Sequence, residues 1–387
     1  MKIKLLFVSP SFFPATKYGG PIFSTLNVCR ELAKKNDEIE IEIHTTNANF
    51  DSRLEVNTKI PIELKELNGV RVHYHSEMIL NRFSPSLLIT LVRKIANFDI
   101  VHSQSIFSIS TPVSIIMCFL LKKKIVVSPR GSLGEWCLEK RGFFKKLWLR
   151  LFFRPFIRSI YWHVTAENEA SEVMRLFPQV GDNSILLIPN GINKRSDVYL
   201  DKDALFNCLK ISGIESFIAS SGRIDKKKGF DYTIRSLALI DNVHLIIMGE
   251  DYGEKQELIE LSDKLGVSHR VHFVGHLDES LKWSLYKYAD LFVLNSRHEN
   301  FGNVYLEALS CGTPIVASTE TPWHFINETD AGLCVENDPV KISSAIKMLL
   351  NEKSKREASC LQVSNDYYWD NIADRFILNY KRILNED

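Results

Sequence analysis

The sequence predicts an α/β protein made of two tandem domains, each a doubly wound parallel sheet with helices on both faces. The length of 387 residues fits two domains of roughly 100–200 residues each. Short apolar runs alternate with helical patterns through both halves of the chain, as they do in βαβ units. Many of these runs are continuously apolar, which is typical of parallel strands buried on both faces.

The apolar runs expected to form strands are three to seven residues long and are rich in Val, Ile, Leu and Phe. In the first half they are Leu5–Val8, Ile39–Thr45, Val70–His73, Ile100–His102, Ile125–Ser128, Tyr161–Thr165 and Ile185–Ile188. In the second half they are Phe217–Ser220, Val243–Met248, Val271–Val274, Leu291–Asn295, Pro314–Ser318 and Gly332–Val335.

Helical spacing fills the gaps between these strands. Ile22, Leu26, Cys29 and Ala33 recur every three or four residues and therefore share one face of a helix. The tail from Trp369 to Leu384 also has the pattern of one helix.

The break between the domains is expected at Pro189-Asn190-Gly191, a turn tripeptide that directly follows a predicted strand. The predicted Rossmann-like domains are residues 1–190 and residues 191–368, and we expect each to bind one ligand. Residues 369–387 are expected to form a C-terminal helix that packs back on the first domain. Ligands of open α/β sheets bind at the carboxyl ends of the strands, so the two domains are expected to share an inter-domain cleft.

The composition argues against several classes of protein. The seven cysteines are an odd number and form no Cys-x-x-Cys, which argues against a disulfide framework or a structural zinc site and favours a reducing compartment. The N-terminal apolar run is too short for a secretory signal. The stretch from Ser105 to Leu121 is too short and too polar to be a membrane span of about 20 residues, so we expect a buried helix there.

The net charge of +1 is divided unevenly along the chain. Residues 1–190 carry 25 Lys and Arg against 17 Asp and Glu, and the remainder carries 23 against 30. A basic half and an acidic half suggest different partners. The basic residues accompany no nucleic-acid-binding motif, so no nucleic acid is expected.

The most informative segment runs from Ser296 to Ala317 and reads SRHENFGNVYLEALSCGTPIVA. Glu299 lies in the loop after a predicted strand, and Glu307 lies eight residues later in the following helix. Amides at a helix N-terminus suit a diphosphate, and carboxylates accept hydrogen bonds from sugar hydroxyls. Taken alone, two glutamates at this spacing are more often solvated helix charges.

The second segment, from Ser221 to Phe230, reads SGRIDKKKGF. Arg223 and Lys228 stand five residues apart in a loop between a strand and a helix. A forked guanidinium and a compact ammonium form a suitable clamp for two phosphates. A run of lysines alone usually indicates a solvated loop, and we expect Lys226 and Lys227 to be surface residues.

Together these segments closely resemble the signature of glycosyltransferase family 4. The shared features are Glu-x7-Glu with Phe-Gly between, Gly-x-Pro-Ile-Val-Ala after the helix, and Gly-Arg…Lys-Gly in the second segment. The resemblance covers nearly the whole chain and is strongest from 217 to 323. It implies the two-domain GT-B fold, a nucleotide diphosphate sugar as donor, and transfer with retention of anomeric configuration. In that fold residues 1–190 would bind the acceptor, and residues 191–368 would bind the donor.

The resemblance also implies roles for single residues. Arg223 and Lys228 would hold the donor diphosphate and stabilise it as it leaves. Glu299 would orient hydroxyls of the sugar, and Glu307 those of the ribose. Glu299 is not expected to be a covalent nucleophile, because a front-face route, in which the donor phosphate receives the acceptor proton, fits better. The further donor-binding residues that it implies are Gly19, Gly20, Phe301, Gly302, Asn303 and Val304.

Two matches lie in the first half of the chain. Gly19-Gly20 ends the loop after the first strand, where paired glycines let the backbone approach a ligand closely; a plain tight turn is the alternative. Many family members carry His-Gly where this chain has Arg130-Gly131, and that histidine contacts the transferred sugar. We expect Arg130 to be catalytic, although it departs from the family pattern.

Residues 140–158 interleave basic and aromatic residues and contain no acidic residue. On a helix the two sets would lie on different faces, with a kink at Pro155. Such a helix suits an anionic membrane surface, whereas the alternative is that the aromatics pack in the core and the basic face is only solvated. The residues expected to contact membrane or acceptor are Lys145, Lys146, Arg150, Arg154 and Arg158.

One further motif would indicate a metal-binding site. Asp201-Lys-Asp203 fits Asp-x-Asp, the metal-binding motif of the other major glycosyltransferase fold. It lies in a charged connecting segment, 193–212, and arginine, lysine and a helix terminus already suffice to neutralise phosphate. No metal ion and no cofactor are therefore expected.

The predicted function is that of a metal-independent, retaining hexosyltransferase. It would move a hexose from a nucleotide diphosphate sugar to a saccharide acceptor, expected to be lipid-linked, in cell-surface polysaccharide synthesis of the O-antigen type. The protein is expected to be cytoplasmic and peripheral on the inner face of the plasma membrane. Two alternatives stay open: a sugar-nucleotide epimerase of GT-B fold, and a non-catalytic nucleotide-sugar-binding membrane scaffold.

Overall fold

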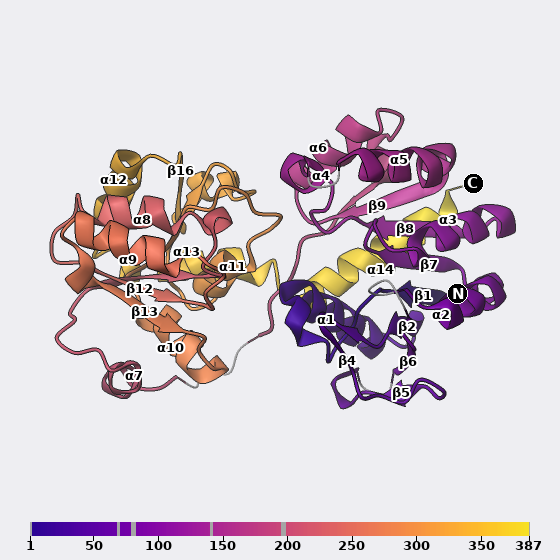
Figure 1. The fold of residues 1–387 in the computed structure, drawn as a ribbon, viewed down its shortest axis with the longest axis horizontal. Coiled ribbons are helices and arrows are strands. Elements are labelled where there is room, and N and C mark those ends of the chain that lie inside the picture. Colours follow the sequence, from indigo (N-terminus) through magenta and orange to yellow (C-terminus); the bar gives the residue numbers. More distant parts are fainter. Residues whose placement is uncertain (1, 68–69, 79–82, 140–141, 195–198, 387) are drawn as a thin grey trace. The chain divides into compact units, whose positions relative to one another are not determined.

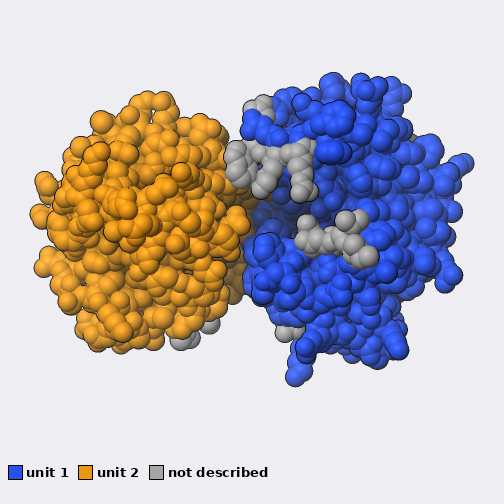
Figure 2. Space-filling model, viewed as in Figure 1, with its two compact units in different colours: residues 1–191, 369–387 blue, residues 192–368 orange. Residues whose placement is uncertain are grey.

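The computed structural model describes residues 2–67, 70–78, 83–139, 142–194 and 199–386. It divides into two compact units, shown in Figures 1 and 2: unit 1 comprises residues 1–191 and 369–387, and unit 2 comprises residues 192–368. Each unit contains one large, mainly parallel sheet with helices. The predicted fold class, two tandem doubly wound α/β domains, is confirmed.

The sheet of unit 1 has, among the described residues, the strand order β10-β9-β8-β7-β1-β2-β6-β5. All neighbours in it are parallel except the edge strand β5, which is antiparallel to β6. Its strands are β1 Ile3–Val8, β2 Ile39–Thr46, β5 Ile62–Glu63, β6 Arg71–His75, β7 Ile100–Gln104, β8 Lys124–Ser128, β9 Ile160–Val164 and β10 Ile185–Leu187. The short hairpin β3 Ala48–Asn49 and β4 Ser52–Arg53 stands apart from this sheet.

The α-helices of unit 1 include the C-terminal one, which is drawn in yellow in Figure 1. They are α1 Gly20–Lys34, α2 Pro85–Lys94, α3 Ser110–Leu121, α4 Glu135–Glu139, α5 Gly142–Phe152, α6 Glu167–Leu176 and α14 Trp369–Asn385.

From Leu5 to Val8, strand β1 is buried on both faces, which explains why this run is apolar without interruption. Leu5 and Phe7 belong to one core, to which α14 contributes Phe376 and Ile377. Leu6 and Val8 belong to the opposite core, which α2 and α3 help to build. Side chains of successive strand residues point to opposite faces, so a strand between two helical layers must be apolar at every position.

Two of the predicted helices differ from the structure. The helix expected from Ser105 begins only at Ser110, because Ser105 has a left-handed backbone with φ of 73°. Its last turn is exposed rather than buried, with Phe119 and Leu120 facing solvent. In the basic segment, α5 ends at Phe152 and a 3-10 helix follows over Arg154–Ser159, so Pro155 ends the regular helix. Lys140 and Arg141 lie outside the described residues.

The sheet of unit 2 has the order β13-β12-β11-β14-β15-β16, and all of its described pairs are parallel. Its strands are β11 Phe217–Ser221, β12 His244–Met248, β13 Val271–Gly275, β14 Leu291–Leu294, β15 Ile315–Ser318 and β16 Gly332–Val335. Its α-helices are α7 Lys202–Leu209, α8 Phe230–Leu237, α9 Lys255–Lys264, α10 Glu279–Tyr288, α11 Asn303–Leu309, α12 Pro339–Leu349 and α13 Lys353–Asn365.

The strand order of each sheet reverses at one place, between β1 and β7 in unit 1 and between β11 and β14 in unit 2. Loops that leave adjacent strands in opposite directions open a crevice at such a point, where ligands of open α/β sheets bind. In unit 2 these loops follow β11 and β14. They lie in the two segments that carry the sequence motifs.

Candidate functional site

The loop after β11 requires glycine at two positions. Gly229 has φ of 64°, and a Cβ there would lie 2.1 Å from the carbonyl oxygen of Asn295. Gly222 has φ of 150°, and its Cβ would lie 2.9 Å from Cε of Lys228. Gly229 therefore lets the β11 loop pack directly against the segment that follows β14, and Gly222 leaves room for the Lys228 side chain.

This close packing joins Lys228 to Glu299, 71 residues later in the chain. The Lys228 Nζ lies 2.5 Å from Oε1 of Glu299, and Ser296 Oγ donates to the same oxygen at 3.0 Å. Both charged side chains are mostly buried, with 14% and 11% of their surface exposed. Burial alone would raise the pKa of Glu299, but the Lys228 ammonium outweighs it and holds that pKa below the ordinary value. Glu299 is therefore ionised at neutral pH.

Arg223 lies in the same loop but in a different environment. Its side chain is 60% exposed, and its guanidinium lies 5.3 Å from the centre of the Tyr252 ring. Its Nε is 3.8 Å from Oδ2 of Asp225, at the outer limit of an ion pair. Arg223 is thus loosely held, whereas Lys228 is fixed. Of the neighbouring lysines, Lys226 is exposed and Lys227 is half-buried.

Glu307 lies on α11 and contacts the helix α10. The buried Tyr286 hydroxyl donates to its Oε2 at 3.0 Å, and Lys282 Nζ lies 3.6 Å from its Oε1. Burial, and then the Glu307 carboxylate, raise the pKa of Tyr286 well above its ordinary value, so the hydroxyl keeps its proton. Sequence reasoning missed both partners. Their spacing of four residues puts them on one helix face, but nothing in the sequence points that face at Glu307.

The turn into α11 holds the other predicted donor-binding residues of unit 2. Gly302 has φ of 82°, and a Cβ there would lie 2.7 Å from the ring of Tyr305. The Phe301 side chain packs against Trp323 and Tyr367 in the core, and its carbonyl accepts a hydrogen bond from Trp323 Nε1 at 2.6 Å. Phe301 can therefore meet a ligand through its backbone but not through its ring. Asn303 and Val304 form the first turn of α11.

In unit 1, Gly19 and Gly20 form the entry to α1. Gly19 has φ of 75° and precedes the helix, and Gly20 is its first residue. A Cβ at either position would meet no other atom within 4 Å. The open space agrees with a backbone that a ligand can approach, and the φ of Gly19 agrees equally with a tight turn.

Arg130 follows β8 with a left-handed backbone, φ 55°. Its Nη1 donates to Oδ1 of Asn190 at 3.1 Å, while its Nε is buried without a hydrogen-bond partner among the described residues. Burial lowers its pKa, against the attraction of Glu169. Both oxygens of Glu169 already accept backbone amides, from Gly131 at 2.6 Å and Thr165 at 2.8 Å. Arg130 therefore carries a buried positive charge whose hydrogen-bonding capacity is only partly used.

Behind Arg130 lies a buried chain of hydrogen bonds. His102 contacts the Tyr380 hydroxyl and Ser128 Oγ, both at 2.7 Å, and Ser128 contacts His163 at 2.8 Å. Burial, together with the charge of Arg130, lowers the pKa of His102 to about 3. The imidazoles are thus neutral at physiological pH, and the chain ties α14 to the centre of the sheet.

The basic segment divides into a packed part and an exposed part. Trp148 donates from Nε1 to the Ile106 carbonyl at 2.9 Å, and Phe153 is buried in the core. By contrast, Phe143 and Phe144 are 75% and 71% exposed. Further exposed apolar side chains on or beside α5 are Leu147, Leu151, Phe119, Leu120 and Leu121. Core packing thus fits Trp148 and Phe153, whereas Phe143 and Phe144 are free to contact a membrane.

The basic side chains of this segment also differ. Lys146, Arg150, Arg154 and Arg158 are exposed. Lys145 is half-buried, donates to the Cys137 carbonyl, and lies 5.2 Å from the centre of the Phe107 ring. In the described part of the chain, no helix combines the length and the apolar character needed to cross a membrane.

The Asp-x-Asp motif has a local structural explanation. Asp201 is the N-cap of α7 and accepts a hydrogen bond from the Ala204 amide at 2.8 Å. An aspartate in this position stabilises the helix start by satisfying one of its amides. Asp203 is exposed in the first turn of the same helix, where its charge is favourable to the helix dipole.

Comparison with known proteins finds a family match in the second half of the chain. Residues 201–360 match the family model described as glycosyl transferases group 1. These residues lie within unit 2, which carries Lys228, Glu299 and Glu307.

Two curated relatives match over parts of the chain. An uncharacterized glycosyltransferase of Methanocaldococcus jannaschii is 32% identical over 228 residues, 54% of this chain and 57% of the relative. A lipopolysaccharide core biosynthesis glycosyltransferase, LpsD, of Rhizobium meliloti is 35% identical over 142 residues, 36% of this chain and 40% of the relative. The chain thus spans about half of the length of the curated relatives it matches.

Among solved structures, HepE of Anabaena in complex with UDP is similar, with a TM-score of 0.73 at 19% identity. The match covers 99% of this chain and 100% of that one. The likeness concerns the fold, which is known as GT-B. It consists of two units, each with a mainly parallel α/β sheet.

Proposed function

We propose that this chain is a retaining, metal-independent glycosyltransferase that moves a hexose from a nucleotide diphosphate sugar to a saccharide acceptor. The observation that carries the proposal is the buried Lys228–Glu299 pair, 2.5 Å apart, at the point where the strand order of unit 2 reverses. It lies in the segment that matches the glycosyl transferases group 1 model. HepE of Anabaena, which has a similar fold, was solved in complex with UDP and with UDP-glucose, which agrees with a nucleotide diphosphate sugar as donor.

Lys228 would stabilise the leaving diphosphate. Its ammonium is held in place before any ligand binds, because Glu299 and the surrounding loops fix it. A cation that needs no reorganisation stabilises developing negative charge more effectively than a mobile one. Arg223 is loosely held and exposed, so it would add its forked guanidinium after the donor enters. The amides of Gly302–Val304 would contribute at the start of α11.

The carboxylates would position the donor. Glu299 is ionised and would accept hydrogen bonds from hydroxyls of the transferred sugar. Glu307, held by Tyr286 and Lys282, would accept those of the ribose. The acceptor hydroxyl would attack from the side of the departing diphosphate, whose oxygen takes its proton, so that no carboxylate becomes covalently attached to the sugar.

In unit 1, Arg130 and the Gly19-Gly20 turn are the residues that would contact a substrate. The unused Nε–H of Arg130 is a donor aimed at no group of the described chain. A phosphate or a sugar oxygen bound there would satisfy it, which makes Arg130 a candidate contact to the transferred group. A buried donor without a partner costs on the order of 1–3 kcal/mol, and a ligand oxygen would recover that energy.

The acceptor is proposed to be lipid-linked and the protein to be a peripheral membrane protein of the cytoplasm. Exposed Phe143 and Phe144 stand on the same short helix as exposed Lys146 and Arg150. Apolar side chains that insert into the headgroup region, beside cations that meet anionic lipid, are the two contributions that hold such helices on membranes. The lipopolysaccharide role of the LpsD relative agrees with a cell-surface polysaccharide as product.

The test is a product assay with purified full-length protein, a panel of nucleotide sugars, and saccharide acceptors with and without a lipid. Mass spectrometry should detect an acceptor that has gained one hexose, and NMR should show that the anomeric configuration of the donor is retained. A matched Glu299→Gln enzyme should lose this product. Release of an isomerised free nucleotide sugar would instead indicate an epimerase, and donor binding without any product would indicate a non-catalytic binder.

A further inference from the structure

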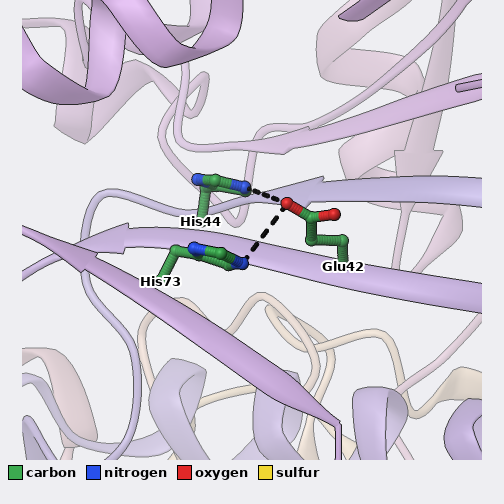
Figure 3. Close-up of side chains that lie close together, drawn as sticks. All are labelled: Glu42, His44 and His73. Atoms are coloured by element: carbon green, nitrogen blue, oxygen red, sulfur yellow. Dashed lines mark hydrogen bonds and ion pairs between the residues drawn. The ribbon is translucent and has the colours of Figure 1, made fainter. Parts of the chain in front are cut away.

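A polar cluster lies on the sheet of unit 1 and takes no part in the proposed donor site (Figure 3). Glu42 and His44 stand two residues apart on β2, and His73 is paired with His44 across the parallel neighbour β6. Alternation along a strand puts Glu42 and His44 on the same face. Ile43, which stands between them, belongs to the opposite face and is part of the core, as is Ile39.

The three side chains converge on one oxygen atom. His44 Nε2 lies 2.7 Å and His73 Nε2 lies 3.3 Å from Oε1 of Glu42, as the dashed lines of Figure 3 show. The two imidazole rings are stacked, with centres 4.4 Å apart and planes at 7°. One ligand atom from each residue lies within 4.8 Å of the other two.

The residues around the cluster are arranged like those around metal-bound histidines in other proteins. His44 Nδ1 shares a hydrogen bond with His75 Nε2 at 2.9 Å, and a hydrogen bond at the far ring nitrogen is what orients a metal-bound histidine. The Lys94 ammonium contacts Glu42 and is the cation that now balances the carboxylate.

We propose that Glu42, His44 and His73 form a binding site for a divalent transition metal of the zinc class. Imidazole nitrogens and one carboxylate are ligands that zinc favours, at about 2.0–2.2 Å, whereas calcium and magnesium favour oxygen alone. Tetrahedral binding needs ligand atoms about 3.4 Å apart, so the three need only small rearrangements. Lys94 would be displaced toward solvent, and water would complete the coordination.

The bound metal would join β2 to β6 and stabilise unit 1, because a ligand that binds only the folded state raises its stability. No step of the proposed sugar transfer involves this site, so its occupancy should change stability without changing the chemistry of transfer. The proposal therefore stands or falls independently of the donor site.

The experiment is a calorimetric titration of tag-free, full-length protein with zinc chloride alone. Cys208 is an exposed free cysteine, and cysteine sulfur is a zinc ligand, so every protein in the experiment carries Cys208→Ser. We expect one site in this parent, at least about 100-fold weaker binding in His73→Gln, and binding that strengthens about tenfold in Lys94→Met, which removes the competing cation. His73 is chosen because it is partly exposed, whereas His44 is fully buried.

The matched control is the His244–His272 pair of unit 2. Its ring nitrogens are 2.9 Å apart and its rings are stacked, but no ion pair to a carboxylate is recorded for it in the described chain. The variant His244→Gln/His272→Gln should bind zinc as the parent does. A thermal shift with zinc, and a cobalt absorption spectrum, should follow the same order of variants. Equal binding in the parent and His73→Gln, or no binding in the parent and in Lys94→Met, would overturn the proposal.

Discussion

Lys228 in unit 2 and Arg130 in unit 1 are both buried cations near the carboxyl ends of parallel strands, but they are neutralised in different ways. Lys228 forms a direct ion pair with Glu299. Arg130 has an amide oxygen at one nitrogen and an unpartnered Nε, while the nearest carboxylate, Glu169, is engaged by backbone amides. Unit 2 thus holds a charge pair that is complete before a ligand arrives, and unit 1 holds a cation that is not.

The two residues would therefore contribute to the binding free energy of a ligand in different ways. At Lys228 a diphosphate must share an ammonium that already has a partner, so the gain lies in preorganisation. At Arg130 a ligand oxygen would satisfy a donor that otherwise stays unmet, so the gain lies in the new hydrogen bond. We order five predictions by the size of the expected effect, and they test this contrast together with the other proposals for the two units.

The largest effect is expected at Lys228. Lys228→Ala should lower kcat/KM by about 30- to 1000-fold, corresponding to roughly 2–4 kcal/mol of transition-state stabilisation. Arg223→Ala should cost less within that range, because the exposed guanidinium is less fixed. Steady-state kinetics with the donor as varied substrate measures both, and Lys226→Ala is the matched control. Near-normal kcat/KM in Lys228→Ala and Arg223→Ala would refute the clamp.

Stability separates the role of the pair from that of the ligand contact. Lys228→Ala leaves a buried carboxylate unpaired, which is destabilising. The double variant Lys228→Met/Glu299→Gln should recover much of the lost stability in urea unfolding, yet stay inactive. Activity that returns with stability would mean that the pair only holds the fold together.

A large effect on membrane binding, and none on donor binding, is expected for the surface of unit 1. Changing Arg150, Arg154 and Arg158 to Gln should lower partitioning onto anionic vesicles by up to about 100-fold, since each basic residue near the surface contributes roughly 1 kcal/mol. Salt should release the wild-type protein. Sedimentation with vesicles and donor affinity are measured on the same variant, and unchanged sedimentation would remove the membrane role.

A smaller effect is expected at Arg130. Arg130→Ala should lower kcat/KM by about 10- to 100-fold, because one charge-assisted hydrogen bond to the substrate is lost. Arg130→Lys keeps the charge but not the Nε donor, so it should recover only part of the rate. If Arg130→Lys equals wild type, the charge alone matters and the unpartnered Nε does not.

The smallest effect is expected from removing metal ions. EDTA should leave kcat/KM within about twofold, because Lys228 and Arg223 neutralise the leaving group. If the zinc-class site of unit 1 is filled in the starting material, EDTA should lower the melting temperature instead. Loss of activity that Mg²⁺ or Mn²⁺ restores would return Asp201 and Asp203 to consideration.

Much of the fold could be predicted because its signals are local. A strand segment buried on both faces is apolar at every position, as in Leu5–Val8 of β1, and such a run is visible without knowledge of its neighbours. The loop positions of Arg223, Lys228 and Glu299 followed in the same way, since each comes directly after such a run or shortly after it. The end of α5 before Pro155 also follows from one residue, because proline cannot continue a helix in its interior.

The sequence alone determined the two α/β sheets and the segments at their strand ends, since hydrophobic periodicity and turn residues act over a few residues. Only the tertiary structure decided that Lys228 meets Glu299, that Tyr286 and Lys282 hold Glu307, and that Arg130 keeps an unpartnered Nε. It also decided which phenylalanines of the basic segment are exposed, and that Glu42, His44 and His73 converge. These contacts depend on strand order and helix packing across tens of residues, and no local pattern encodes which loops a parallel sheet will bring side by side.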